Sequence, residues 1–341
     1  MAAVCLFSRQ PAVASDLLDA SFAPASELIA DPNVVTLPSS VMLSFLTWRL
    51  CAHIVKESDS MIVNAGCQLE YDTTTPTAFI FQIQAAHADG QTVVREAIKL
   101  PSGCRFEAIV DPVTQNRIMR TVLGPGVIQV GYEATIETPG VADVPDAVSE
   151  IDFMGLPAET LPFLTPSRYC PSDTFTQFSS ETFGGLAPGH RRVQSICDWI
   201  FTNVRYQAGS TGPNSSAADV FKSGAGVCRD FAHLGISLCR ALGIPARYVS
   251  VYAAGLQPQD FHATFQAFLN GPNGGAWYMF DPTRMSSADA VVRIAVGHDA
   301  ADVAFAWPQA PVSVKKMAVW ANAEGRTQNT RTSAAIPAVS S

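Results

Sequence analysis

The sequence predicts two folded domains, a β-sandwich followed by an α+β domain. Residues 61–138 contain short runs of β-branched and aromatic residues separated by turn-forming residues, which is typical of a sandwich. Residues 139–157 are rich in proline and acidic residues, and we place the domain boundary there. From residue 190 onward apolar residues recur at intervals of three and four, the spacing of a helix that packs on a core.

Composition restricts the kind of protein. Of the 341 residues, 48% are hydrophobic and 15% are charged, which is the balance of a globular chain. The net charge of -8 argues against a nucleic-acid binder, because such binding is built from clustered cations. The longest uncharged segment near the N-terminus, residues 32–48, is too short and too polar to span a bilayer. Arg9, the only cation among the first forty residues, follows the apolar patch, so we expect a cytoplasmic protein without a secretory signal.

The eight cysteines are scattered along the chain, without a Cys-x-x-Cys pair or the spacing of a zinc finger. We therefore expect no structural metal, and most cysteines to be small buried groups in a reducing compartment. The sequence contains no calcium-binding loop, and no cofactor is expected.

The N-terminal half divides at Met61. Residues 1–60 are rich in Ala, Ser and Pro, and we interpret them as an extension that is either poorly ordered or not translated, with translation beginning at Met61. The sandwich domain is expected over 61–145. Its strand patterns start at Met61 and include residues 78–83, 92–95, 105–110 and 127–136.

The second domain is expected over 146–320, followed by a tail at 321–341. Helical spacing predicts helices over 190–206, 216–221 and 228–242. Strands are predicted over 246–252 and 261–269, and a third around 277–280 after a loop at 270–275. The aromatic residues Trp199, Phe201 and Tyr206 lie at helical spacing, and we expect them in the core.

Cys228 is the candidate nucleophile. It follows the glycine-containing segment 224–226 and opens the predicted helix 228–242. Backbone N–H groups at a helix start lack partners within the helix, and the helix dipole favours negative charge there, so a thiolate is stabilised. The N–H of Cys228 is also placed to help hold an oxyanion. Cys239 lies in the helix interior, where packing explains it.

A nucleophilic cysteine needs a base, and two histidines compete for that role. His233 follows Cys228 by five positions on the predicted helix, which turns it by roughly 140°, so the two side chains diverge. We reject His233 as the base. Asp230, in the first turn of the same helix, is expected to stabilise the helix start.

His262 is the better base. It lies on the polar side of the predicted strand 261–269. Pairing across the 270–275 loop, with Leu269 opposite Gly274 or a near neighbour, puts His262 close to Asp281, whose carboxylate can orient the ring. We therefore predict Cys228 as nucleophile, His262 as base and Asp281 as the orienting group.

Several segments carry a family resemblance: GVCRDFAH at 226–233, RALGIPARYVS at 240–250, His262-Ala263, and FDPT at 280–283. On these residues the chain resembles the bacterial transglutaminase-like family, whose members are described as candidate cysteine proteases. The resemblance extends over about residues 61–320. It implies a papain-like α+β core, in which the helix carrying the cysteine packs on an antiparallel sheet, and a preceding β-sandwich. Cys228, His262 and Asp281 match the catalytic triad of the family.

These observations lead us to expect a cysteine-dependent amide or peptide hydrolase that acts through a thioester acyl-enzyme on a peptide or protein amide. One alternative is a transglutaminase or acyltransferase, which passes the acyl group to an amine. A second alternative is a noncatalytic module that binds a peptide in the same cleft. The sequence leaves the physiological substrate and the oligomeric state open.

Overall fold

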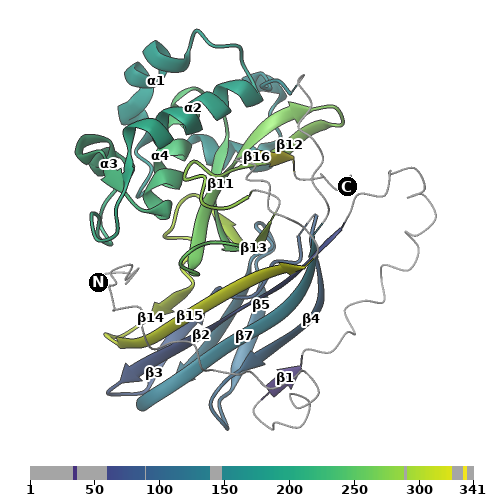
Figure 1. Ribbon diagram of the computed structural model, residues 1–341, viewed down its shortest axis with the longest axis vertical. Coiled ribbons are helices and arrows are strands. Elements are labelled where there is room, and N and C mark those ends of the chain that lie inside the picture. The colour runs from purple at the N-terminus through teal and green to yellow at the C-terminus, as the bar shows by residue number, and fades with distance from the viewer. Residues whose placement is uncertain are drawn as a thin grey trace, which may run out of the picture.

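The computed structural model describes residues 34–36, 60–88, 90–138, 148–287, 290–324 and 333–335. Figure 1 shows the helices α1 to α4 gathered at one end and the long strands of the sandwich at the other. The predicted fold, a sandwich followed by an α+β core, is confirmed. Most of the predicted N-terminal extension, and of the predicted tail, lies outside the described residues.

The sandwich consists of two antiparallel sheets, ordered β1-β4-β7-β2-β15 and β14-β3-β6-β5. Alternate residues of β2 are buried from Met61 onward, as the two-residue period of a half-buried strand requires. β1, in the segment where no strand was predicted, pairs with β4. The strands are β1 (Val34–Thr36), β2 (Met61–Thr73), β3 (Thr77–Phe81), β4 (Thr92–Lys99), β5 (Phe106–Val110), β6 (Arg117–Leu123), β7 (Gly126–Thr138), β14 (Ala306–Pro308) and β15 (Ser313–Glu324).

The last long strand returns to the first domain. β15 pairs with β2 along nearly its whole length, and β14 pairs with β3. The second domain was predicted over 146–320, whereas β14 and β15 belong to the sandwich sheets. Only Val319 and Ala321 of β15 are buried, so the strand carries little of the apolar alternation that would have revealed it. β15 covers an edge of β2 that would otherwise present unpaired backbone groups.

The second domain packs helices against the antiparallel sheet β13-β10-β11-β12-β16. α2 ends at Asn203, three residues before the predicted helix end at Tyr206. Its elements are η3 (Phe153–Gly155), η4 (Ala158–Leu164), η5 (Ser172–Phe175), α1 (Thr176–Phe183), α2 (His190–Asn203), β8 (Arg205–Tyr206), α3 (Ala217–Ser223), β9 (Ala225–Gly226), α4 (Cys228–Ala241), β10 (Ala246–Ala253), β11 (Phe261–Gly271), β12 (Gly274–Phe280), β13 (Val291–Gly297) and β16 (Ser333–Ala335).

The β11–β12 hairpin is tighter than predicted. Gly271 pairs with Gly274, so most of the predicted 270–275 loop is strand and the turn has two residues. Leu269 pairs with Ala276, a register two residues away from the pairing with Gly274. Because the side-chain period of a strand is two, this shift leaves every side chain on the face that was predicted.

α4 is the central helix of the domain. Thirteen of its fourteen residues are buried, in contrast to the single buried stripe of a surface helix. It packs on β11, and at Gly235 a Cβ atom would lie 2.6 Å from the ring of Phe265. The glycine therefore lets the helix lie directly against the sheet.

Polar contacts and a continuous apolar core join the two domains. The hydroxyl of Tyr252 on β10 donates to the carbonyl of Ile83 at 2.6 Å. The side chain of Asn116 forms hydrogen bonds with both the backbone N–H and the carbonyl of Val296. A single hydrophobic cluster extends from the sandwich through α4. Among the residues that the structure describes, no helix is long and apolar enough to cross a bilayer.

We expect Gly235→Ala to lower the free energy of unfolding by roughly 1–3 kcal/mol, because the added methyl group must push α4 away from Phe265. Chemical denaturation measures this change. Gly185→Ala is the matched control, since a Cβ there has no neighbour within 4 Å, and we expect a change within about 0.5 kcal/mol. Equal stability of the two variants would contradict the close packing of α4.

Candidate active site

The start of α4 holds Cys228 in place. β9, immediately before it, pairs in parallel with β8, which fixes the path of the chain into the helix. A Cβ at Gly226 would lie 2.8 Å from the Cβ of Asp230, so only glycine permits this close turn. Cys228 is the first residue of α4 and is 6% exposed. Its position at the positive end of the helix dipole is the one that the sequence predicted.

Asp230 secures this helix start. Its Oδ2 accepts hydrogen bonds from the N–H of Val227, at 2.9 Å, and from the hydroxyl of Thr211. Its Oδ1 pairs with the guanidinium of Arg229 at 3.1 Å. The predicted role of Asp230 at the helix start is therefore confirmed. The buried carboxylate satisfies a backbone N–H that has no partner within the helix.

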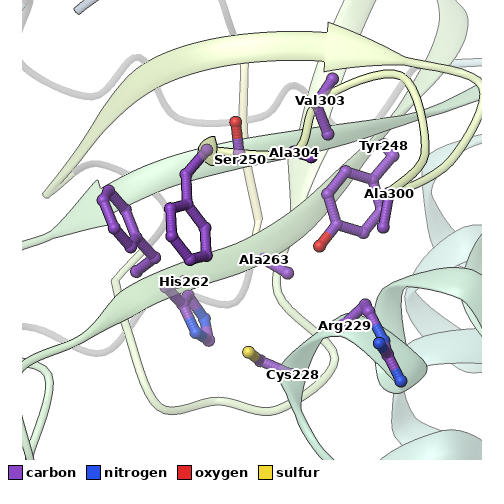
Figure 2. A pocket seen from close by; sticks show the side chains of 11 residues that line it. Cys228, Arg229, Tyr248, Ser250, His262, Ala263, Ala300, Val303 and Ala304 are labelled. Carbon is purple, nitrogen blue, oxygen red and sulfur yellow. The ribbon is translucent and has the colours of Figure 1, made fainter. Parts of the chain in front are cut away.

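The structure brings Cys228, His262 and Asp281 together. His262, near the start of β11, lies with its Nε2 2.9 Å from Oδ2 of Asp281, which directly follows β12. A carboxylate can only accept, so Nε2 carries a proton, which leaves Nδ1 for the hydrogen bond between His262 and Cys228. Figure 2 shows the sulfur of Cys228 pointing toward the His262 ring, whereas Arg229 points away.

Asp281 is fully buried and accepts five hydrogen bonds. One comes from His262. The N–H and hydroxyl of Thr283 both donate to Oδ1, and the N–H and hydroxyl of Ser286 both donate to Oδ2. These donors come from the turn after β12. They hold the carboxylate in one orientation and compensate for its loss of water.

The His262–Asp281 pair is charged. Burial by itself disfavours the imidazolium, but the Asp281 carboxylate and the hydrogen bonds to Asp281 and Cys228 raise the pKa of His262 to about 10. Burial raises the pKa of Asp281, yet His262, Thr283 and Ser286 together hold it below its ordinary value. A cation therefore lies beside Cys228 at neutral pH.

His233 has a structural role, as its rejection as the base implies. It is fully buried in α4, and its Nε2 accepts a hydrogen bond from the N–H of Ala300 at 3.1 Å. Burial lowers its pKa to about 3, so the ring is neutral. The Tyr169 ring stacks on its side chain, and the Tyr248 ring contacts it at a tilt.

A pocket opens beside the sulfur of Cys228 (Figure 2). Its walls come from β10, β11 and the segment after β13. The Phe261 and Phe305 rings stack at 4.6 Å between centroids and close one side. The remaining lining residues besides Cys228 and His262 are Arg229, Tyr248, Ser250, Ala263, Ala300, Val303 and Ala304. In the part of the chain that the structure describes, no group of three or more His, Cys, Asp and Glu side chains could hold a metal ion.

Some residues around this site were not predicted from the sequence. Thr283 and Ser286 donate hydrogen bonds to Asp281. In the sequence, the only sign of this role is that two residues with hydroxyl groups follow Asp281-Pro282 closely. Tyr206 was expected in the core, yet it is 43% exposed and contacts Cys228. Phe201 is 44% exposed. The helical stripe does not include Tyr206, because α2 ends before it.

Two protein families match the chain. Residues 176–282 match the core of the transglutaminase-like superfamily, and residues 61–159 match the N-terminal domain of bacterial transglutaminases. The first range contains Cys228, His262 and Asp281. The two matches correspond in order to the α+β core and the sandwich.

Among solved structures, a candidate cysteine protease from Cytophaga hutchinsonii is 35% identical, with a TM-score of 0.75, over 82% of this chain and 98% of that one. An uncharacterized protein of Mycobacterium leprae is 31% identical over 153 residues, 41% of this chain and 52% of the relative. One from Mycobacterium tuberculosis is 29% identical over 143 residues, 39% of this chain and 46% of the relative. The chain spans about half the length of these curated relatives.

We expect iodoacetamide at neutral pH to alkylate Cys228 at least about tenfold faster than any other cysteine of the described residues. Burial raises the pKa of Cys67 and Cys170 to about 12, whereas Cys228 faces a cation and a pocket. Peptide mass spectrometry over time measures the rates. Cys104, partly exposed in the sandwich, reports ordinary reactivity. Equal rates at Cys104 and Cys228 would favour a noncatalytic binding module.

Replacing Asp281 by Asn should lower the pKa of His262 from about 10 toward its ordinary value of 6.5, because burial is then opposed by fewer interactions. An NMR titration of the His262 ring measures the change. Asp198→Asn is the control, since Asp198 lies on the surface and pairs with Arg284. An unshifted His262 in the Asp281 variant would show that another group holds its proton.

The same pair predicts a pH dependence of stability. The folded pKa of His262 is raised, so its stabilising contribution is complete below pH 6.5 and is lost as pH rises to about 10. The pKa of Asp281 is lowered, so its contribution is complete above pH 3.8 and is lost in stronger acid. The advantage of the wild type over Asp281→Asn in denaturant unfolding should therefore shrink between pH 6.5 and 10. A constant advantage across that range would contradict the ion pair.

Proposed function

This chain belongs to the transglutaminase-like superfamily, and on that premise we propose that it is a cysteine-dependent amide or peptide hydrolase that acts through a thioester. The observation that carries the proposal is a series of hydrogen bonds that joins Cys228 to His262 and His262 to Asp281. Cys228 lies at the start of a buried helix. Covalent acyl transfer requires a nucleophile, a base that contacts it, and a carboxylate that orients the base.

In the proposed reaction the thiolate of Cys228 attacks the amide carbonyl carbon. A C–S bond forms, and the carbonyl oxygen becomes an oxyanion. When the intermediate collapses, the C–N bond breaks and the imidazolium of His262 gives its proton to the departing amine. Neutral His262 then takes a proton from water, whose oxygen attacks the thioester. The C–S bond breaks, and the products are a carboxylic acid and the restored thiolate–imidazolium pair.

The surroundings support each step. Asp281 keeps Nε2 of His262 protonated, so Nδ1 is the atom that exchanges the proton with the reacting groups. The helix dipole of α4 stabilises negative charge at its first turn, by about 0.3–1 kcal/mol for an exposed group and more for a buried one. The N–H of Cys228 lies at that first turn, where it can donate to the oxyanion.

The pocket beside Cys228 supports a substrate whose acyl part is small and apolar. Ala263, Ala300 and Ala304 form much of its wall, and Phe261 and Phe305 close it. Apolar walls bind apolar groups, because their burial removes apolar surface from water.

Water and an amine can both accept the acyl group from the proposed thioester, and the superfamily includes transglutaminases. We favour water, since nothing in the pocket selects an amine over it. Offering biotinylated cadaverine during turnover separates the two. Incorporation of the biotin label into the acyl product would favour the transamidase, and release of free acid alone the hydrolase.

Cys228→Ala and His262→Ala should each lower turnover by about 10⁴-fold or more, because each removes a group that takes part in bond making. Release of amine from a peptide library, screened first with the wild type, measures turnover. Thermal unfolding checks that the variants remain folded. Cys104→Ala, a substitution in the sandwich, should retain activity. Substantial turnover by the Cys228 or the His262 variant would contradict the mechanism.

A further inference from the structure

A second cavity, which Cys228 does not line, lies between the two domains. Its volume of about 280 Å³ is close to the lower limit of small-molecule sites, roughly 300 Å³. From the sandwich it is lined by Gln82, directly after β3, and by residues between Asp111 and the start of β6. From the second domain it is lined by η4 and by the end of β13 with the segment that follows. A ligand in this cavity would therefore contact both domains.

Gln82 brings an unsatisfied acceptor to this cavity. The residue is 7% exposed, and its Nε2 donates to the carbonyl of Asp302 at 2.8 Å. Its backbone N–H donates to the carbonyl of Phe305 at 3.1 Å. Because a carbonyl can only accept, the side-chain amide has one orientation, and Oε1 is the atom that remains. Within the described part of the chain, no donor reaches this buried oxygen. A ligand with N–H groups would remove the cost of leaving it unpaired.

Two carboxylates line the same cavity. Oδ2 of Asp302 accepts from the backbone N–H of His298 at 2.8 Å and lies 2.7 Å from its Nδ1, which leaves Oδ1 for a further partner. Asp111 accepts three hydrogen bonds at Oδ1, from the N–H of Val113 and from the N–H and hydroxyl of Thr114, which leaves Oδ2. No lysine or arginine is among the lining residues that the structure describes. The available atoms are therefore acceptors, and two of the groups carry negative charge.

The rest of the wall fits an alkyl chain. Phe163, which is 8% exposed, and Ile118 line the cavity together with the carboxylates. A ligand that combines N–H donors, a positive charge and an alkyl chain matches all of these groups. A metal ion would instead need several ligands that converge on one point. Among the described residues, no group of three or more His, Cys, Asp and Glu side chains meets that requirement.

We propose that the cavity between the domains is a binding site for an alkylammonium ion, whose N–H groups donate to Oε1 of Gln82 and to the carboxylates of Asp302 and Asp111. Gln82 and Asp111 belong to the sandwich and Asp302 to the second domain, so the bound ion joins the two. A lysine side chain and a free polyamine both supply this chemistry. The site does not depend on any reaction at Cys228, and the inference therefore goes beyond the proposed function.

An NMR titration of the histidine rings with butylammonium chloride at pH 8 tests the site. The His298 ring reports on the cavity, because it pairs with Asp302, and the His262 ring reports on the pocket beside Cys228. We expect saturable shifts at His298 and none at His262. Butyltrimethylammonium keeps the charge without N–H donors, and 1-butanol keeps the chain without the charge. Both should bind at least about tenfold more weakly. Sodium chloride keeps the ionic strength equal throughout.

Matched variants test the residues. Asp302→Asn keeps an acceptor for His298 but turns an amide N–H₂ toward the cavity, so we expect the Kd of butylammonium to rise at least about tenfold. Asp111→Asn makes the same test from the sandwich side and remains available if the first variant fails to fold. Asp198→Asn, which removes a surface carboxylate paired with Arg284, should bind like the wild type. Thermal unfolding without ligand checks that each variant is folded.

Three results would overturn the inference. The first is the absence of a saturable shift at His298, or a shift at His262 alone, which would place the amine beside Cys228. The second is equal binding of butylammonium and butyltrimethylammonium. The third is an unchanged Kd in the folded Asp302 and Asp111 variants. If the site is upheld, Nα-acetyl-lysine methylamide and spermidine distinguish the source. Tighter binding of the first indicates a lysine side chain, and tighter binding of the second a free polyamine.

Discussion

The buried carboxylate of Asp281 is the constraint on which the rest of the site depends. A charge without contact to water is tolerated only when hydrogen bonds replace its solvent, and here five do so. Because Thr283 and Ser286 occupy the other acceptor positions, His262 has a single way to bind. That orientation presents the second ring nitrogen to Cys228. The charge state and the direction of the imidazole thus have one common cause.

The helix and the sheet provide complementary halves of the site. α4 contributes Cys228 at its positive end, and β11 contributes His262. Their distance is set by packing along the helix, which includes the close contact of Gly235 with Phe265. Dense interiors transmit small displacements, so a change at this contact alters the geometry of a sulfur that lies two turns away.

Local chemistry made much of the site predictable. The sequence shows a cysteine at a helix start, a histidine on the polar side of a strand and an aspartate after the next strand. The observed pairing of Leu269 lies two residues from Gly274, which keeps His262 on the predicted face. Long-range pairing was not predictable. Tyr206 lies near Cys228 because two short strands, β8 and β9, pair although a helix separates them in the chain. In β15 buried apolar and exposed polar residues alternate too weakly to predict its pairing with β2. Such contacts depend on the assembled fold rather than on neighbouring residues.

The return of β15 to β2 has a consequence for biosynthesis. Residues more than two hundred positions apart are neighbours in one sheet, and all strands of the second domain except β16 lie between them in the chain. Contacts between residues so far apart in the chain form slowly, because a long loop must close before they stabilise the fold. A nascent chain on the ribosome can form β2 and β7 early, but the sheet gains its β15 edge only after residue 324 has emerged from the exit tunnel. Until then β2 is an open edge, the kind of surface that chaperones shield from aggregation.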